Sequence, residues 1–502
     1  MKEEKKLFSN AFYLFLDLFF INLFSLFYVL TIWKFLPPED YGVIATTTNF
    51  SLLFSNICFL GFGTANPKLI SEYYQKKQVE KIGALLRFSF LVSSTFFLIF
   101  SAITTFLYLN FIASFKLPLD SFLLALISIF FIIAYGISGS VLYGLQNMKK
   151  YFISEFVSYF VKFILAFLLL FLGFGYLGAL ISFTLSYLIG FLARLEKKWF
   201  SISNNLNKKF ILSNYALPAF FMSIFSLFIN NSQYVILTFI QNPEVTGIFG
   251  TALTASFVIT LIPNILSASL FPIISQLSVV KGKEQKQSYL ASIVTRYILL
   301  FSFPSILFFS IFSGELIMFF AGESYLPSSQ FLPVLTLASF FFGLGNYFLS
   351  CLYGIRRTTL TRNISLSFTF LFLLLALPLT YFFSSFGLSL AYFVSMLLYF
   401  FTGLIFMKKY LQLKALAKPL AKILLVSAIF GLLLLTSEIF AFRFYFKILV
   451  LFLAGLIYFV LLIPLNFYQQ EEIRILNYLG RRLPLFKSLF FKLANFLSKY
   501  TS

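Results

Sequence analysis

Two ionisable residues inside one long apolar run are the clearest candidates for chemistry. Lys162 and Glu155 both lie in the run 152–173. A charge within a lipid bilayer costs several kcal/mol, so each predicts a functional site. If a helix enters the bilayer at about Tyr151, Lys162 lies ~16 Å deep, near the middle of a ~30 Å hydrocarbon core. Lys162 can then anchor an anionic group, with Glu155 on the same helix face as its counter-charge. The structural alternative is a lysine that pairs with a neighbouring helix or extends toward the membrane surface.

Asp17 is a third ionisable residue in an apolar run, 10–33. It belongs to a polar face at helical spacing, made up of Asn10, Tyr13, Asp17, Ser25 and Tyr28. Asp17 can bind a proton or cation that drives transport, or pair with Lys162. The alternative is hydrogen-bonded packing between helices.

A second polar stripe follows the run 215–240, with spacings of 3, 4 and 3 residues. Its members are Ser223, Ser226, Asn230 and Gln233. In the run 42–65, Asn49, Asn56 and Gly63 form a heptad line that fits either a binding surface or a seam of close helix packing.

Arg87 and Arg296 open two apolar runs that occupy equivalent places in the chain. They can attract an anionic head group at the cytoplasmic mouth, or act as ordinary basic anchors of a membrane helix. The candidate binding residues are therefore Lys162, Asp17, Glu155, Asn230, Gln233, Asn49, Asn56, Arg87 and Arg296.

The composition of the 502 residues is typical of an integral membrane protein. Apolar residues make up 60 % and charged residues 11 %, and the chain contains 76 Phe. The absence of histidine removes imidazole as a metal ligand or catalytic base. The two cysteines, Cys58 and Cys351, both lie in apolar runs and do not form a disulfide framework. Since no phosphate-binding loop, carboxylate pair in a soluble domain or activated nucleophile is visible, we expect neither an enzyme nor a bound cofactor.

The apolar runs predict an all-α membrane protein with about fourteen transmembrane helices, because ~20 apolar residues cross a bilayer as one helix. We read the first run, 10–33, as a retained helix rather than a cleaved signal peptide. The expected spans are 10–33, 42–65, 84–110, 120–145, 152–173, 176–194, 215–240, 246–275, 291–320, 331–354, 362–383, 387–407, 420–440 and 445–465.

The basic residues predict the orientation. With the N-terminus inside, 33 of the 38 Lys and Arg fall in cytoplasmic segments or the adjoining helix ends. This bias is the positive-inside rule, and it places both termini in the cytoplasm. It also accounts for the net charge of +21 without a nucleic-acid partner.

A stretch that occurs twice indicates an internal duplication. The segment 38–42 (PEDYG) opens an apolar run that ends at Pro67, and 243–247 (PEVTG) opens one that ends at Pro272. Residues 142–145 and 174–175 recur, in the same order, as 352–355 and 386–387. We therefore expect two pseudo-symmetric six-helix bundles in the same orientation, 1–197 and 198–410, with a V-shaped cavity between them.

Two further helices and a tail follow the repeat. Residues 411–466 hold helices 13 and 14, and 467–502 are expected to form a basic amphipathic segment along the inner leaflet. Phe486, Phe490, Leu493 and Leu497 would form its apolar face, and Lys487, Lys492 and Lys499 its charged face.

The turns resemble those of a known family. The segment 36–42 (LPPEDYG) and a following helix that ends in 61–63 (GFG) and Pro67 look like the start of the polysaccharide biosynthesis flippases. These belong to the multidrug/oligosaccharidyl-lipid/polysaccharide (MOP) exporter superfamily. Residues 243–249 and 174–179 resemble its second glycine turn and its entry to helix 6. The chain has Gln233 near the place where many members carry an Asp.

The resemblance implies a carrier in the cytoplasmic membrane that moves a polyprenyl-pyrophosphate-linked oligosaccharide by alternating access. Lys162 would then contact the pyrophosphate, and H⁺ or Na⁺ would drive transport. Membrane lipids and the enzymes of polysaccharide assembly are the expected partners. Two alternatives are a cation-coupled multidrug exporter of the same superfamily and an integral-membrane glycosyltransferase or polymerase. Flipping of a peptidoglycan precursor is a special case of the first interpretation.

Overall fold

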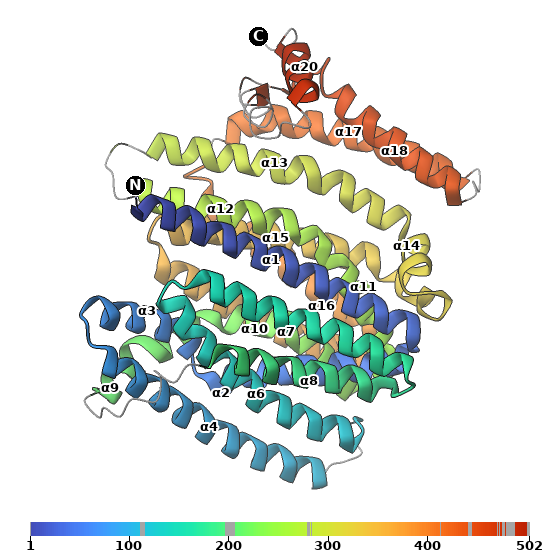
Figure 1. Cartoon of the computed structure of the whole chain (residues 1–502). Helices are drawn as coiled ribbons and strands as arrows, with labels where there is room; N and C mark the ends of the chain where they lie inside the picture. Colours follow the sequence, from blue (N-terminus) through green and yellow to red (C-terminus); the bar gives the residue numbers. More distant parts are fainter. Residues whose placement is uncertain are drawn as a thin grey trace. The chain divides into compact units, whose positions relative to one another are not determined.

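The structure is all-helical within the residues it describes, in agreement with the sequence prediction. This computed structural model describes residues 2–110, 116–195, 206–278, 282, 284–411, 413–439, 444–468, 470, 472–473, 477 and 487–498. No β-strand occurs in these ranges (Figure 1). A helix satisfies its backbone hydrogen bonds internally, which is the condition for crossing lipid.

The first repeat contains seven described helices. They are α1 (Lys2–Phe35), α2 (Pro38–Phe59), α3 (Phe62–Gln75), α4 (Val79–Asn110), α6 (Leu119–Gly144), α7 (Met148–Phe171) and α8 (Gly175–Arg194).

The second repeat is more interrupted. It contains α9 (Lys208–Ile211), the π-helix η2 (Leu212–Ala216), α10 (Leu217–Ile240), α11 (Pro243–Ser256), the 3₁₀-helix η3 (Phe257–Thr260), α12 (Leu261–Leu277), α13 (Glu284–Ile311), α14 (Ser313–Phe320), η4 (Glu323–Gln330), α15 (Leu332–Gly354) and α16 (Thr358–Met407). After the repeat come α17 (Leu413–Ile439), α18 (Phe444–Leu461) and α20 (Lys487–Ser498).

Eleven helices of the described chain are long and apolar enough to cross a membrane. The segments 227–240 and 446–461 are shorter apolar helices. One of the eleven, the 50-residue α16, contains two of the expected spans, separated at Ser384 by a non-helical φ of 54°. The multi-pass fold is therefore as predicted, and the count of fourteen spans stays a prediction.

Local sequence explains where the helices of the first repeat begin and end. Pro38 occupies the first turn of α2, where a missing backbone N–H costs nothing. At the other end of α2 the chain turns through Leu60 and Gly61, whose φ values of 48° and 76° are left-handed. Glycine tolerates this conformation, so the expected span 42–65 is divided between α2 and α3.

Spatial contacts divide the chain into two compact units. Unit 1 comprises 1–254, 314–331 and 362–395, and unit 2 comprises 255–313, 332–361 and 396–502. Unit 1 therefore contains the whole first repeat together with parts of the second. The boundaries predicted at 197, 410 and 466 follow the sequence repeat, whereas these units follow spatial contact; those domain boundaries stay a prediction.

Each unit has its own apolar core. In unit 1, residues such as Phe62, Leu85 and Ile129 join α2, α3, α4 and α6. In unit 2, residues such as Ile298 and Tyr347 join α12, α13 and α15.

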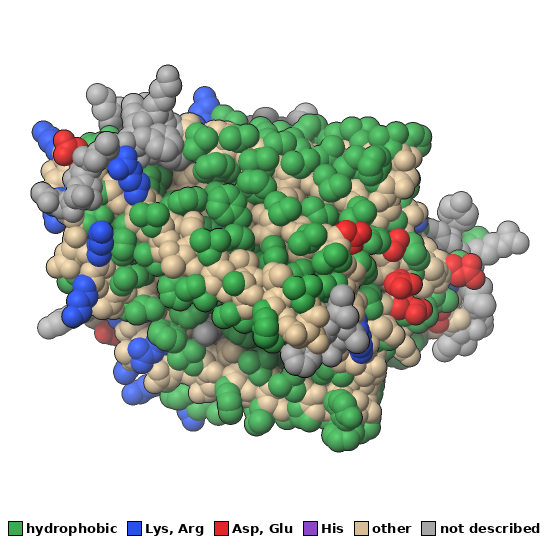
Figure 2. Space-filling model, turned by 90° about the horizontal axis from the view of Figure 1, so that it is seen from below, with side chains coloured by type: hydrophobic (Ala, Val, Ile, Leu, Met, Phe, Trp, Pro, Cys, Tyr) green, Lys and Arg blue, Asp and Glu red, His purple; other side chains and the backbone are tan. Residues whose placement is uncertain are grey.

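Many large apolar side chains are exposed instead of buried. Leu109, Phe171 and Phe382 are each about seven-tenths exposed. On the face in Figure 2, hydrophobic side chains form a broad band, with most Lys and Arg side chains at one end and acidic groups gathered toward the other. Lipid is the solvent that such a surface requires.

For the predicted tail, α20 covers 487–498, and the side chain of Lys492 is exposed. Phe486 and Lys499 lie outside the described residues, and so do the side chains of Phe490, Leu493 and Leu497. The amphipathic interpretation of the tail therefore stays a prediction.

Candidate functional site

The candidate site lies along the seam between α1 and α7. The two helices run in the same direction, and phenylalanine pairs such as Phe20 with Phe156 and Phe24 with Phe160 line their contact at ring-centre distances of 5.1 and 5.5 Å. Two groups of polar residues interrupt this aromatic seam. The paired rings keep a nearly constant offset in residue number along the two helices. Residues of α1 and α7 at the same position along the helix axis therefore face each other.

The first polar group surrounds Lys162. Its Nζ lies 4.8 Å from the ring centre of Tyr28 on α1 and 4.5 Å from that of Tyr159 on α7. Tyr28 is itself held by a 3.0 Å hydrogen bond from its hydroxyl to the carbonyl oxygen of Ala179 on α8. In the described part of the chain Lys162 forms no ion pair; the acidic partners of the ion pairs are Glu155, Glu472 and Glu438. The ammonium group therefore rests on aromatic faces, which attract cations.

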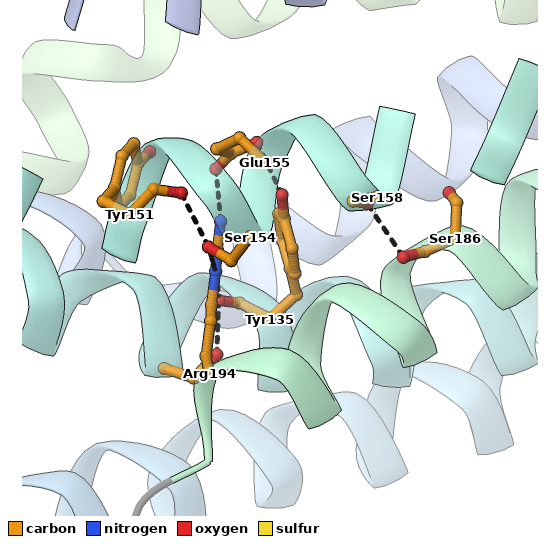
Figure 3. A network of polar contacts seen from close by, with 8 residues as sticks. Tyr135, Tyr151, Ser154, Glu155, Ser158, Ser186 and Arg194 are labelled. Atoms are coloured by element: carbon orange, nitrogen blue, oxygen red, sulfur yellow. Dashed lines mark hydrogen bonds and ion pairs between the residues drawn. The ribbon is translucent and has the colours of Figure 1, made fainter. Parts of the chain in front are cut away.

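The second polar group joins α6, α7 and α8 around Arg194 (Figure 3). Arg194 ends α8 and is only 1 % exposed, and its guanidinium pairs with the Glu155 carboxylate. The same guanidinium donates to Ser154 Oγ and to the carbonyl oxygen of Tyr135, both at 2.9 Å. The Tyr135 hydroxyl donates to the other Glu155 oxygen at 2.5 Å. Both charges are thus fully engaged, as buried charges must be.

The prediction that Glu155 is the counter-charge of Lys162 is wrong, because the Glu155 carboxylate pairs with Arg194. Sequence reasoning missed this partner because Arg194 stands at the end of an apolar run, beside Lys197 and Lys198, where a basic residue is ordinary. Its burial is a tertiary feature. The one feature of the sequence that could have indicated the burial of Arg194 is its position before the other basic residues of that segment.

Asp17 lies on α1 near this arginine cluster. Its side chain is 7 % exposed, and one of its carboxylate oxygens is buried without a hydrogen-bond partner. Glu155 and Arg194 both act on it electrostatically, with opposite signs. Asp17 is thus a second buried carboxyl group in the neighbourhood of the Glu155–Arg194 pair, and a bound proton would remove its charge.

The predicted polar stripe of the run 215–240, most of which forms α10, is partly described. Gln233 is 0 % exposed; its amide nitrogen donates to the carbonyl oxygen of Ile229 at 2.9 Å, and its amide oxygen has no hydrogen-bond partner. Asn230 is half-buried. The side chains of Ser223 and Ser226 lie outside the described part of the chain.

The two asparagines of α2 bond within their own helix. Asn49 donates to the carbonyl oxygen of Ala45 and Asn56 to that of Leu52, each at 2.8 Å, and Asn56 is exposed. Their binding role stays a prediction.

The two arginines that open equivalent runs have different surroundings. Arg87 on α4 is exposed. Arg296 on α13 is 4 % exposed, pairs with Glu472 and lies 5.3 Å from the ring centre of Phe467. The segment after α18 therefore covers Arg296, which sequence symmetry did not foresee.

Three of the nine candidate residues, Asp17, Glu155 and Lys162, lie on the two neighbouring helices α1 and α7. The other six are distributed over α2, α4, α10 and α13. Within the described residues, no group of three or more Cys, Asp or Glu is placed to hold a metal ion.

Comparisons with known proteins define the class of this membrane protein. The fold is similar to that of the lipid II flippase MurJ in an inward closed conformation, with a TM-score of 0.73, 18 % identity, and coverage of 89 % of this chain and 96 % of that one. It is also similar to an inward-facing multidrug resistance MATE family transporter of the MOP superfamily, with a TM-score of 0.61, 13 % identity, and coverage of 78 % and 95 %. A MOP superfamily transporter from Pyrococcus furiosus matches with a TM-score of 0.51, 13 % identity, and coverage of 81 % and 96 %. The chain is therefore a multi-pass membrane protein with the fold of MOP flippases and transporters.

A sequence-family model gives the particular family. The model described as polysaccharide biosynthesis protein matches residues 7–278, more than half of the chain. The protein belongs to this family. No curated protein matches it.

Proposed function

We propose that this protein flips a polyprenyl-pyrophosphate-linked oligosaccharide across the cytoplasmic membrane for the assembly of a surface polysaccharide or glycan. Its family membership and its fold support this proposal. The single observation that carries it at the residue level is Lys162, a cation inside a membrane-spanning helix that rests on two tyrosine rings and has no acidic partner among the described residues.

Lys162 has the chemistry of an anchor for a pyrophosphate. Tyr28 and Tyr159 hold its ammonium group through their faces, which leaves its hydrogen-bond donors free for an anion. An ammonium–phosphate contact in a low dielectric is strong, because little water competes for either charge. This role makes Lys162 the residue whose charge matters most for binding the lipid-linked substrate.

The pair of Asp17 and Glu155 supplies a coupling site. The buried Asp17 carboxyl, one oxygen of which has no hydrogen-bond partner, would take up a proton or Na⁺, and release of that ion on the other side of the membrane would drive transport. We assign Asp17 as the acceptor, because Glu155 is already bound by Arg194 and Tyr135.

The test is a flipping assay with a fluorescent polyprenyl-pyrophosphate sugar in proteoliposomes. Lys162→Ala should lower the flipping rate at least tenfold, and Lys162→Arg should keep most of it, because the positive charge remains. Asp17→Asn should abolish the dependence on a proton or Na⁺ gradient. Equal rates for wild type and Lys162→Ala would refute the anchor role.

A second candidate function is cation-coupled export of organic cations, favoured by the buried acidic charge of Asp17 beside an aromatic seam. Its test uses the same vesicles. No movement of any lipid-linked sugar, together with efflux of an organic dye that Asp17→Asn abolishes, would replace the flippase proposal with this one.

A further inference from the structure

A buried ion pair on α13 has no part in the proposed function. Arg296 on α13 is 4 % exposed, and its partner Glu472 is 8 % exposed. The guanidinium meets the Glu472 carboxylate through Nη2, and the same carboxylate oxygen accepts a hydrogen bond from the Tyr297 hydroxyl at 2.8 Å. The ring centre of Phe467 lies 5.3 Å from the guanidinium carbon. One carboxylate oxygen therefore accepts from both Arg296 and Tyr297.

The guanidinium of Arg296 is not fully satisfied by this carboxylate. Its Nε is buried and has no hydrogen-bond partner. Arg194, which is equally buried, donates from Nε, Nη1 and Nη2 alike. A buried donor without an acceptor costs free energy, and Nε together with one Nη forms a planar edge that matches two oxygens of one oxyanion. The edge of Arg296 is therefore only half used.

The carboxylate that covers Arg296 comes from outside the predicted membrane spans. Glu472 follows the last expected span, 445–465. Lys422 on α17 holds the chain six residues earlier, by donating to the carbonyl oxygen of Asn466 at 3.0 Å. Arg87, at the equivalent place in the first repeat, is exposed. The cover over Arg296 is therefore an addition of the segment after α18, and Glu472 can withdraw from α13 without moving a predicted span.

The position of Arg296 along α13 indicates which anions can reach it. Arg296 lies five residues after the start of the expected span 291–320, which is about 8 Å along a helix. That depth is close to the boundary between the head groups and the hydrocarbon core, on the side that the basic residues predict to be cytoplasmic. Phosphate is the anion of lipid head groups, and it offers more acceptor oxygens than the one that Glu472 presents.

We propose that Arg296 and Tyr297 form a phosphate-binding site, which Glu472 occupies as an internal competitor. A phosphate accepts side-on from Nε and Nη2 of Arg296 and accepts a third hydrogen bond from the Tyr297 hydroxyl. The Glu472 carboxylate then leaves for the aqueous side. The phosphate is either the head group of an anionic membrane lipid or a free phosphate. This inference does not depend on the proposed transport function.

Binding of a fluorescent phosphatidic acid to the purified protein in detergent tests the site by fluorescence anisotropy. Glu472→Gln should raise the affinity roughly tenfold, about the value of one charge-assisted hydrogen bond, because the competitor loses its charge. Arg296→Gln should lower the affinity of the parent and of Glu472→Gln to the same level. Arg296→Lys should not restore binding, since an ammonium group cannot bind side-on.

The ion pair between Glu438 and Lys447 supplies the matched control. Glu438→Gln removes a carboxylate from an ion pair of α17 and α18 and should leave the affinity for phosphatidic acid unchanged. Inorganic phosphate that displaces the probe from Glu472→Gln would identify a free phosphate as the ligand. Displacement by unlabelled phosphatidic acid alone would identify a lipid head group.

A second measurement uses the parent chain, so it does not depend on the folding of Glu472→Gln. Trypsin cleaves after Arg474, two residues beyond Glu472. Saturating phosphatidic acid should make this cleavage severalfold faster in the parent, because Glu472 is displaced, and should not change it in Arg296→Gln. Equal affinities of the parent and a folded Glu472→Gln, or a cleavage rate in the parent that phosphatidic acid does not change, would overturn the proposal.

Discussion

At the scale of single residues, the Glu155–Arg194 pair shows how this protein keeps charge inside a membrane. Burying either ion alone would cost several kcal/mol. The pairing of the two ions and their hydrogen bonds with Tyr135 and Ser154 offset that cost. Removing one partner should destabilise the protein much more than removing both, because the remaining charge would be buried without an ion-pair partner and without water.

We therefore predict that Arg194→Met lowers the free energy of unfolding by about 3–5 kcal/mol. The double variant Arg194→Met/Glu155→Gln should regain most of that loss, because neither side chain is then charged. Thermal unfolding of the purified protein in detergent measures both. A double variant no more stable than Arg194→Met would contradict the assignment of this ion pair.

At the scale of elements, α16 is two expected spans joined by a very tight turn. Ser384 takes the left-handed φ of 54°. Three residues later Gly387 lies so close to the first half of α16 that a Cβ atom would be 1.9 Å from the carbonyl oxygen of Leu379. The glycine is therefore required by the close approach of the backbone, not by its own φ. Its sequence signal was the recurrence of 174–175 as 386–387.

Gly387→Ala should consequently destabilise the protein by about 1–3 kcal/mol, because the backbone must move to admit a methyl group. Gly455→Ala on α18 is the matched control, since no atom lies within 4 Å of the added Cβ. The control should be neutral, or more stable by up to ~1 kcal/mol, because alanine favours a helix. Unfolding midpoints in the same detergent compare the two variants. Equal losses would show that the turn tolerates a side chain.

At the scale of the whole molecule, the distribution of charge predicts the orientation in the membrane. Most Lys and Arg belong to segments on one side of the predicted spans. Among the described residues on the opposite side, Lys116 donates to the carbonyl oxygen of Ile240 at 3.0 Å, and Lys447 pairs with Glu438 at 2.8 Å.

Cysteine labelling of intact cells checks this orientation. Lys76 after α3 and Glu323 in η4 are both exposed and are predicted to lie on opposite sides of the membrane. A membrane-impermeant maleimide should label Glu323→Cys in intact cells, and Lys76→Cys only after the cells are permeabilised. The reverse labelling pattern would contradict the predicted topology.

The sequence by itself determined the all-helical membrane fold and the family. Lipid offers no hydrogen bonds, so a long apolar run that crosses a membrane has to form a helix. Composition and run length therefore predict an all-α membrane protein. The repeat and its Pro–Gly turns were visible for a related reason, because backbone geometry requires those residue types locally. Asp17, Glu155 and Lys162 also stood out in sequence, since charge is rare in apolar runs.

Only the tertiary structure decided which groups these residues contact. The Glu155 carboxylate meets Arg194, 39 residues later, and Lys162 meets Tyr28 on another helix. Such partners depend on helix rotation and register, which are set by side-chain packing across the seam of α1 and α7, and no local spacing encodes them. The contact of Gly42 with the turn that holds Gly247 is also decided by the tertiary structure. The sequence shows that the turn is repeated, and the structure shows that the two copies touch.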